Sequence, residues 1–248
     1  MNSPGTARRT ATARERARAE LTREIKEEAR RQLVATGADG LSLRAVAREL
    51  GMVSSALYRY YPSRDDLLTA LIIDAYNALG AVAEHAIACP APARERWIAA
   101  CHAIRDWARS NPHEYTLIYG SPVPGYRAPE ATIGPASRVP LAFVVVVSEA
   151  LADGELAAPR EALPVTGALA EQAVTLSVAL SAATGSPESS GAAAGAPPDA
   201  LVRAVIAWTQ LFGMISFELF GQFVGSFEPA DALFAYTVAQ LTAFVGLR

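Results

Sequence analysis

Residues 40–64, GLSLRAVARELGMVSSALYRYYPSR, decide the fold of the N-terminal part of the chain. Ser42 precedes an apolar-periodic run and is predicted to cap a helix that ends near Leu50, because its hydroxyl can accept a hydrogen bond from an unpaired backbone N–H. Gly51 then supplies the positive φ of a sharp turn. Ala47 has a small side chain, which allows a second helix to cross the first closely and steeply. The segment is therefore predicted to form a helix-turn-helix.

The second helix of this pair is predicted over Ser54–Tyr61, and Pro62 ends it. Met52 and Leu57 are expected to anchor the helix to the core. The other face combines hydroxyl groups, aromatic rings and one guanidinium group, and it comprises Ser54, Ser55, Ala56, Tyr58, Arg59 and Tyr60. Such groups suit phosphates and base edges, so this face is a candidate nucleic-acid contact. The alternative is a structural helical hairpin whose polar residues are coincidental.

The distribution of charge indicates a polyanionic partner for the N-terminal part. Residues 1–64 carry 13 Arg and Lys against 7 Asp and Glu, a net charge of +6. Residues 65–248 carry 9 against 18, a net charge of −9. A basic head on an acidic body favours a nucleic-acid-binding module joined to a part that does not bind polyanions. On charge alone, a solvated basic helix explains the head equally well.

The first residues of the chain are predicted to form a flexible basic arm over 1–18. From about Arg14 to Thr36 the pattern is helical, and Gly37 ends that helix. The arm contains five arginines, at positions 8, 9, 14, 16 and 18. They either enter a minor groove, as basic arms do elsewhere, or remain solvated, and both possibilities stay open.

The rest of the chain alternates between helical segments and Pro/Gly breaks. Helices are expected over 64–87, 94–110, a short aromatic stretch after Pro112, 137–153, 164–183, 199–224 and 229–246. Residues 120–140 are expected to be a loop, and 184–198 a disordered low-complexity loop. No stretch alternates with a period of two, so the fold class is predicted to be all-α. The helices are expected to form a head over 19–80 and a helical body over 81–248.

The segment from about Thr22 to Leu71 resembles the DNA-binding domain of TetR-family transcriptional regulators. The resemblance includes the basic amphipathic first helix and a set of ordered residues, Gly37, Leu41, Ser42, Ala47, Gly51, Leu57, Tyr58, Tyr60 and Tyr61. SRDDLL at 63–68 stands where the family has a Ser-Lys-Glu-x-Leu-like opening of its fourth helix. The family implies that 19–80 form a three-helix DNA-binding head and that 81–248 form a helical ligand-binding and dimerisation body. The fourth helix, expected over 64–87, is long enough to join the two.

The resemblance implies two sets of DNA contacts. One set holds backbone phosphates and comprises Ser42, Arg44, Tyr58, Tyr60 and Arg64. The other faces the major groove and comprises Ser54, Ser55, Ala56 and Arg59. Val53 departs from the family, because a capping Ser or Thr often stands there. Either Ser54 caps the recognition helix instead, or that helix begins less firmly than usual.

HEYTLIYGSPVPG at 113–125 and WTQLFG at 208–213 resemble a TetR C-terminal domain subclass named for Trp, His and Gly. Phe212 stands where that subclass usually has His, so no inherited ligand is implied. The body is expected to hold an apolar pocket for a hydrophobic small-molecule effector. Its candidate residues are Trp97, Cys101, Tyr115, Ile118, Tyr119, Phe143, Trp208, Phe212 and Phe217. The alternative for each is a plain core residue.

Several other classes of site are not expected. His85, His102 and His113 share no helix at ligand spacing, so neither a metal nor a cofactor is predicted. Cys89 and Cys101 form no dense disulfide framework, which favours a reducing cytoplasm. Catalytic motifs such as G-x-S-x-G or H-E-x-x-H are missing from the sequence, so an all-α enzyme is less favoured.

The most membrane-like stretch is residues 204–227. Gln210, Glu218 and Gln222 would be costly at bilayer depth, so a buried helix is favoured over a spanning one. The polar, Arg-rich N-terminus shows no secretory signal. A membrane-associated regulator remains an alternative, and no membrane partner is predicted.

The function expected from the resemblance is a homodimeric repressor that an effector releases from DNA; activation instead of repression remains open. The final two helices are the expected dimer interface. Alanines and three glycines allow close approach there, the glycines being Gly213, Gly221 and Gly225. The apolar area comes from Phe217, Leu219, Phe220, Phe234 and Phe244. A two-fold dimer would place two recognition helices about 34 Å apart on a palindromic operator.

Overall fold

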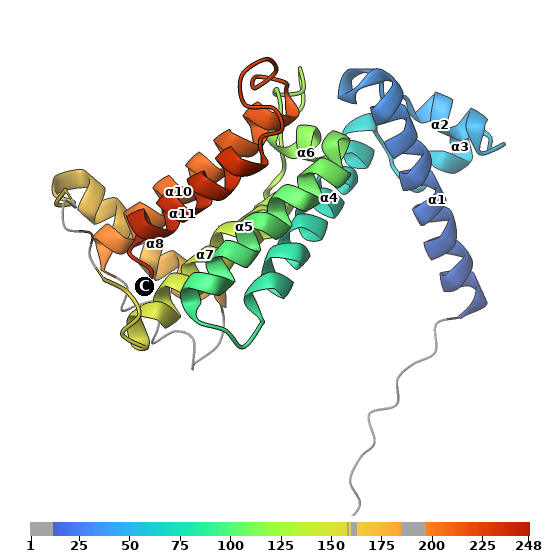
Figure 1. Cartoon of the computed structure of the whole chain (residues 1–248). Coiled ribbons are helices and arrows are strands. Elements are labelled where there is room, and N and C mark those ends of the chain that lie inside the picture. The colour runs from blue at the N-terminus through green and yellow to red at the C-terminus, as the bar shows by residue number, and fades with distance from the viewer. Residues whose placement is uncertain (1–11, 158, 160–162, 185–196) are drawn as a thin grey trace, which may run out of the picture. The chain divides into compact units, whose positions relative to one another are not determined.

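The computed structural model describes residues 12–157, 159, 163–184 and 197–248, and all of their side chains except those of 180–184. These residues form two compact units (Figure 1). The first extends to Leu71 and includes Pro122–Ala128; the second comprises Ile72–Ser121 and Pro129–Arg248. The described residues contain helices and one isolated antiparallel bridge, between Leu156 and Leu247. The predicted all-α fold is confirmed.

The first helix, α1 (Ala13–Thr36), begins earlier than the predicted arm allows. Thr12 accepts a hydrogen bond from the backbone N–H of Glu15, and the Glu15 side chain accepts one from the N–H of Thr12. This reciprocal capping box satisfies two backbone donors and starts the helix there. Residues 13–18 are therefore helical, which corrects part of the predicted arm; its first 11 residues lie outside the described part. Gly37, at φ 71°, ends α1.

The helix-turn-helix follows a short 3₁₀ turn, η1 (Ala38–Gly40), and consists of α2 (Leu43–Glu49) and α3 (Ser54–Leu57). Gly51 between them has a φ of 65°, as the sequence predicts. The packed face of the unit consists of fully or nearly fully buried apolar side chains, namely Ile25, Ala29, Leu33, Leu43, Val46, Ala47, Leu57, Leu67 and Leu68. This core fixes the angle between the two short helices.

The α3 helix is shorter than predicted. Regular α-helix ends at Leu57, and the chain continues to Tyr61 in tight turns in which the backbone N–H groups of Tyr60 and Tyr61 both donate to the carbonyl of Leu57, at 2.8 and 3.1 Å. Val53 occupies the N-cap position. Because valine has no side-chain acceptor, the helix begins without a side-chain cap, and Ser54 is its first residue rather than its cap.

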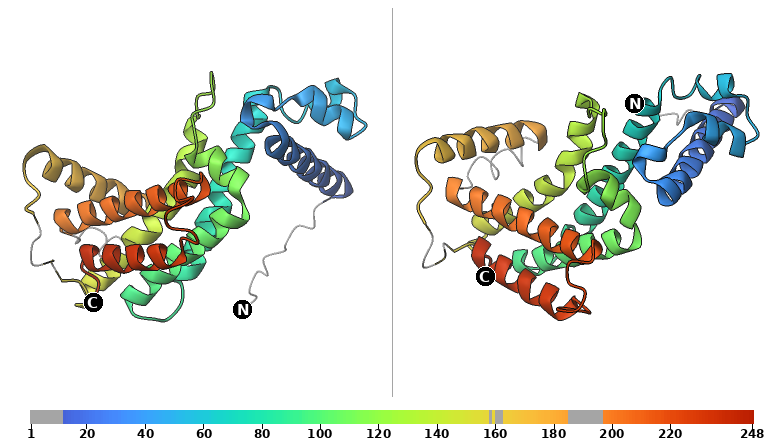
Figure 2. Two further views of the ribbon diagram at one scale, coloured as in Figure 1. Left: turned by 45° about the horizontal axis from the view of Figure 1, so that its top comes forward. Right: turned by 90° about the horizontal axis from the view of Figure 1, so that it is seen from above.

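The second unit is built from seven helices of the described chain. They are α4 (Arg64–Ile87, which begins in the first unit), α5 (Ala93–Ser110), α6 (Pro112–Tyr119), α7 (Ile133–Ala152), α8 (Gly167–Thr184), α10 (Pro198–Leu219) and α11 (Asp231–Val245). Figure 2 shows α10 beside α11, and α10 also packs against α7 and α8. The core lies among α5, α7, α10 and α11.

Two helix boundaries differ from the sequence prediction. The start of α7 lies at Ile133 rather than 137, after the 3₁₀ turn η2 (Glu130–Thr132), because Pro135 falls in its first turn, where proline is tolerated. The end of α10 lies at Leu219 rather than 224. Gly221 follows at a φ of 75°, a left-handed conformation that a helix cannot continue through. The predicted disordered loop falls largely on residues outside the described part.

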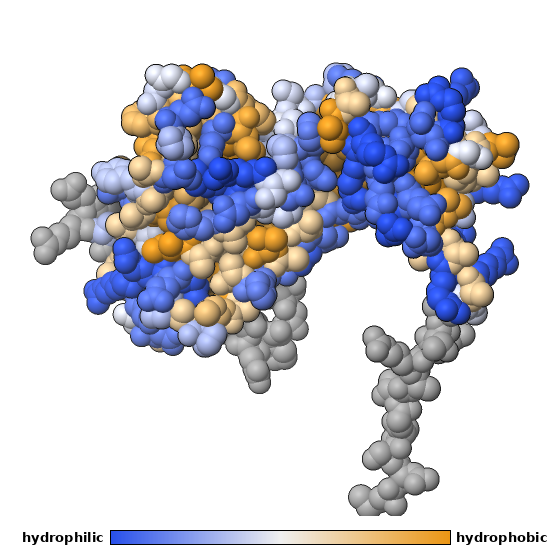
Figure 3. All heavy atoms as spheres, turned by 45° about the vertical axis from the view of Figure 1, so that its right-hand side comes forward, coloured by the Kyte–Doolittle hydropathy of each residue, from blue (hydrophilic) through white to orange (hydrophobic). Residues whose placement is uncertain are grey.

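Three stretches of the described chain are long and apolar enough to cross a membrane, by length and composition only: α4, Glu130–Ala152 and α10. In each, 44% of the hydrophobic window is buried within the protein. The sequence singled out only one such region, around α10. The surface facing the viewer in Figure 3 combines strongly hydrophilic areas with apolar patches.

Candidate nucleic-acid interface and effector site

A surface cavity of about 470 Å³ lies at the start of α2 and the end of the α3 turn. It brings together four of the nine residues predicted to contact DNA, namely Ser42, Arg44, Tyr58 and Arg64. Ser63 adds a third hydroxyl group, and Pro62 and two leucines complete the lining. Two guanidinium groups and three hydroxyl groups around one hollow form a concave, cationic surface of the kind that accepts phosphate oxygens.

Local hydrogen bonds set the positions of two of these residues. The hydroxyl of Ser42 accepts from the backbone N–H of Ala45 at 3.4 Å, so Ser42 caps α2 as predicted. The Ser42 N–H donates to Oε1 of Gln32 on α1 at 3.2 Å. Arg64 donates from Nη2 to the carbonyl oxygen of Ala38 at 2.7 Å, which holds the guanidinium group against η1. Nη1 of Arg64 also lies 3.6 Å from a carboxylate oxygen of Asp65, so two contacts set the position of this guanidinium group.

The residues predicted to face the major groove lie on α3 and the turn after it. Ser55 and Arg59 are exposed, and Ser54 and Ala56 are half-buried. Leu57, between them in sequence, is completely buried and anchors this segment. The arrangement presents a hydroxyl and a guanidinium group to solvent from one short, rigid element, as base reading requires.

Tyr60 is half-buried and lies beside the first helix. The guanidinium carbon of Arg18 lies 5.3 Å from the centre of the Tyr60 ring, a cation–π distance. The structure therefore joins one arginine of the predicted arm to one of the predicted phosphate-contacting tyrosines. No sequence pattern indicates this pair, because 42 positions separate the two residues.

In the second unit, the predicted effector residues fall into two groups. Trp97, Cys101 and Phe143 are fully buried, and the ring centres of Trp97 and Phe143 lie 4.5 Å apart. The other group is a cluster of ring contacts formed by Tyr115, Tyr119, Trp208 and Phe212, with Ile118 packed on the core beside them. Burial raises the pKa of the Cys101 thiol.

Phe217 does not join either group. Its side chain is 54% exposed, and its ring contacts Phe223 instead. Phe217 follows Phe212 by five residues, which places it about 140° around α10, so the two cannot face the same interior. The prediction that Phe217 shares a pocket with the other aromatic residues is therefore wrong.

The aromatic cluster contains both satisfied and unsatisfied polar groups. Tyr115 donates from its hydroxyl to the carbonyl of Phe212 at 3.1 Å and is 2.8 Å from the hydroxyl of Ser216. Burial raises the Tyr115 pKa to about 12, although the Ser216 contact opposes that rise. The indole N–H groups of Trp97 and Trp208 are buried and have no hydrogen-bond acceptor within the described residues. Such donors are costly to leave unpaired.

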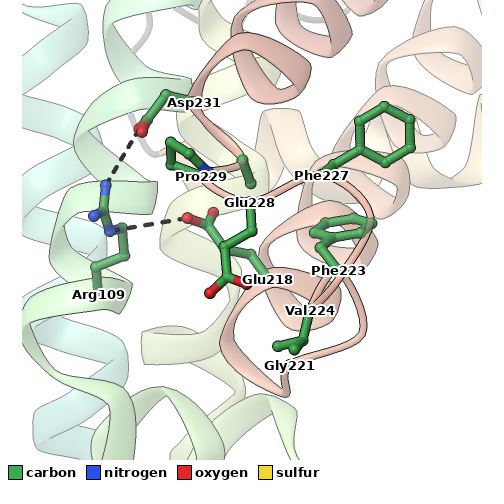
Figure 4. A pocket seen from close by; sticks show the side chains of 10 residues that line it. Arg109, Glu218, Gly221, Phe223, Val224, Phe227, Glu228, Pro229 and Asp231 are labelled. Atoms are coloured by element: carbon green, nitrogen blue, oxygen red, sulfur yellow. Dashed lines mark hydrogen bonds and ion pairs between the residues drawn. The ribbon is translucent and has the colours of Figure 1, made fainter.

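The loop between α10 and α11 lines a cavity of about 210 Å³ beside a network of ion pairs (Figure 4). Arg105 on α5 is buried and donates to both carboxylate oxygens of Glu218, at 2.7 Å each, and to Asp231 at 2.9 Å. Its guanidinium group also lies 4.5 Å from the ring centre of Phe234. Arg109 adds a weaker contact to Asp231, at 3.5 Å. These residues tie α5, α10 and α11 together.

The network was not predicted from the sequence. Arg105 lies on the helical stripe of Cys101, Ile104 and Ala108, so its placement among buried apolar residues is a signal that could have indicated a buried ion pair. Its partners lie more than 100 residues away in sequence. Among the described residues, no group of three or more His, Cys, Asp or Glu side chains is placed to hold a metal ion.

A second apolar feature lies between α8 and α10. A groove of about 410 Å³ is lined by seven aliphatic side chains and Gln172, the aliphatic ones being Leu169, Ala173, Leu176, Leu201, Val202, Val205 and Ile206. Leu169 and Ile206 are 48% and 41% exposed. Gly213 continues the exposed face of α10, and a Cβ added there would meet open space. The groove is therefore an apolar surface exposed on the single chain.

Comparison with protein families gives two matches. Residues 25–71 match the family described as "Bacterial regulatory proteins, tetR family". Residues 97–241 match the one described as "Tetracyclin repressor-like, C-terminal domain". The two matches fall on the helix-turn-helix and on the body. Neither description mentions the Trp-His-Gly subclass, so that assignment stays a prediction.

Comparison with individual proteins agrees. The chain is 39% identical over 214 residues to HTH-type transcriptional regulators Mb1846 of Mycobacterium bovis and Rv1816 of Mycobacterium tuberculosis, covering 84% of this chain and of each relative. A crystal structure of the regulatory protein SCO4313 is also similar. The two sequences are 35% identical, and the structures superpose with a TM-score of 0.70 over 93% of this chain and 98% of that one. A regulator from Marinobacter aquaeolei VT8, 16% identical, shares the fold with a TM-score of 0.59 over 94% of this chain and 100% of that one.

Proposed function

Because the chain belongs to the TetR family, whose members are transcriptional regulators and not enzymes, we propose that it is a repressor that a hydrophobic small molecule releases from a palindromic operator. Its helix-turn-helix is a DNA-binding element. The repressor role, the dimer, the operator and the effector are parts of the proposal. The observation that carries the proposal is the cationic hollow at the start of α2, next to the exposed face of α3.

The proposed DNA contacts divide by position. Ser42, Arg44, Tyr58 and Arg64 around the hollow bind phosphates on the strand that borders the groove. Tyr60, whose ring contacts Arg18 on α1, binds a further phosphate. From α3 and its turn, Ser54, Ser55, Ala56 and Arg59 face base edges. The hollow supports the first part because two cationic groups, those of Arg44 and Arg64, both line it. Arg59 supports the second, because an arginine can bind both acceptors of a guanine.

The proposed dimer uses the exposed apolar face of α8 and α10. Two copies related by a two-fold axis would place Leu169, Leu176 and Ile206 of each chain against the same face of the other. Burying these apolar side chains between two copies would stabilise the dimer, because it removes apolar surface from water. Gly213 would allow close approach of the two α10 helices. On α11, Phe244 is exposed and available to the interface, whereas Phe234 is fully buried within its own chain.

The proposed effector site is the aromatic cluster of Tyr115, Tyr119, Trp208 and Phe212. An apolar molecule with a hydrogen-bond acceptor would suit this cluster, because the buried indole N–H of Trp208 could donate to it. The α4 helix runs from the first unit into the second, so it is the proposed link between effector and DNA. Release requires that the effector bind one conformation more tightly than the other.

The test is a fluorescence-anisotropy titration of the purified chain against the DNA upstream of its own gene. Tight binding that weakens as salt rises, and that a hydrophobic effector abolishes, would support the proposal. Binding without sequence preference would contradict it. Trp208→Phe keeps an aromatic ring but removes the N–H and the five-membered part of the indole, so it should weaken the effector response and leave DNA affinity unchanged.

The proposal places the protein in the cytoplasm, where its DNA target is. A membrane-associated regulator is the alternative, given three helices with the length and composition of membrane spans. Size-exclusion chromatography with light scattering, in the absence of detergent, separates the two. A stable soluble dimer is expected. Aggregation that only detergent reverses would favour the alternative.

A further inference from the structure

The first two turns of α1 project beyond the packed part of the first unit. Every residue from Ala13 to Glu20 is exposed, whereas Ile25, Ala29 and Leu33 further along are buried. This overhang is held in a helix at its start by the capping box at Thr12. Its arginines, unlike those of a flexible tail, therefore have defined directions.

Helical geometry assigns these directions. At 100° per residue, Arg14 and Arg18 lie within about 20° of the buried stripe that contains Ile25, and Arg16 lies about 180° from it. Arg14 and Arg18 therefore face the side of α1 on which the rest of the unit packs. The cation–π contact between Arg18 and Tyr60 is an independent observation of the same direction.

We propose that Arg14 and Arg18 form a rigid extension of the DNA-binding surface and bind backbone phosphates next to the one held by Tyr60. The inference rests on the proposed operator binding and adds to it a contact made from α1. Arg18 is exposed beside the Tyr60 ring, and a guanidinium group that contacts a ring still carries N–H donors that an anion can accept from. Arg23, the next arginine along α1, is instead paired with Glu20 and Glu27 on its own helix.

Charge complementarity identifies the occupant as nucleic acid backbone. The described part of the overhang carries three arginines and two glutamates, and Glu15 is engaged in the capping box. Arg14 and Arg18 are one helical turn apart, which is about 5.4–6 Å along the axis. That spacing is close to the separation of successive phosphates along one strand. A series of phosphates can therefore pass from Tyr60 along the overhang.

The test compares Arg18→Ala with Arg16→Ala, which removes the same charge from the opposite face of the same overhang. Affinity for operator DNA is measured at several salt concentrations. Since a dimer would lose two phosphate contacts, Arg18→Ala should lower the slope of log K against log salt by roughly 1.8 and weaken binding about 10- to 30-fold near 0.15 M salt. Arg16→Ala should leave both quantities close to wild type.

Two further variants complete the experiment. Arg14→Ala should behave as Arg18→Ala does, and Arg18→Lys should keep most of the salt slope because it keeps the charge. Circular dichroism checks that each variant retains its helix content. Equal effects of Arg18→Ala and Arg16→Ala would overturn the inference while leaving operator binding intact. If the wild-type chain did not bind its operator at all, the proposed function itself would fail.

Discussion

The ion-pair network around Arg105 allows a quantitative prediction for the stability of the body. The Arg105 side chain is 5% exposed and binds both oxygens of Glu218, whose side chain is 16% exposed. Replacing Arg105 by alanine would leave the Glu218 carboxylate largely out of water without its partner. Losing one partner of a buried pair typically costs about 3–5 kcal/mol. We expect the lower part of this range, because Asp231 is 58% exposed and can be hydrated.

The expected change in melting temperature follows from the size of the chain. A loss of about 3 kcal/mol corresponds to roughly 6–12 °C for a protein of this length. Arg109→Ala is the matched control: its side chain is 50% exposed, and its contacts to Glu218 and Asp231 are 3.9 and 3.5 Å long. It should cost less than about 1 kcal/mol, because exposed ion pairs contribute little.

The measurement is thermal and urea unfolding of the variants at one protein concentration, since dimerisation would make stability concentration-dependent. A double variant, Arg105→Met with Glu218→Leu, separates lost charge pairing from lost packing. It should be more stable than Arg105→Met alone, because no charge is then left buried. If Arg105→Ala lowers the free energy of unfolding no more than Arg109→Ala does, the buried pair of Arg105 and Glu218 contributes no more than an exposed one.

Three further predictions concern single groups. Cys101 is fully buried and its thiol pKa is raised, so a thiol reagent should modify only Cys89 in the folded protein and both cysteines in denaturant. Two hydrogen bonds from Arg138 lower the pKa of Glu84. The stability that this pair contributes should therefore be present at neutral pH and lost as pH falls below the ordinary range of a glutamate pKa. Carboxyl NMR of wild type and Arg138→Ala would measure the difference in the Glu84 pKa. Gly51→Ala should cost about 1–2 kcal/mol in denaturant unfolding, since φ is 65° there and the surrounding space is open.

The local features of the fold could be predicted from sequence because each depends on neighbouring residues. Ser42 caps α2, Gly51 takes a positive φ, and Leu57 is buried, all as the pattern of the helix-turn-helix indicates. The early start of α7 does not follow from the sequence pattern, because a proline such as Pro135 ends most helices but is tolerated in the first helical turn, where it lies. The end of α10 was missed because the apolar pattern continues past Gly221, where the backbone turns.

Features that depend on distant residues could not be predicted in this way. The pair of Arg18 and Tyr60, and the network of Arg105 with Glu218 and Asp231, join elements that are far apart in sequence. Composition identified the aromatic residues of the body but not their directions, so Phe217 was grouped with side chains that face away from it. The angle of about 140° between Phe212 and Phe217 around α10 distinguishes the two directions.

If α3 and the turn after it recognise DNA, Arg59→Ala should lower the affinity for the operator. Anisotropy titrations of wild type, Arg59→Ala and Arg48→Ala against the upstream DNA use Arg48 as the control, because it is exposed on α2 and paired with Glu49. Loss of a base contact should cost Arg59→Ala about 1–3 kcal/mol in binding and relax the preference for one base. Arg48→Ala should change affinity little. Identical affinity and base preference in wild type and Arg59→Ala would contradict the claim.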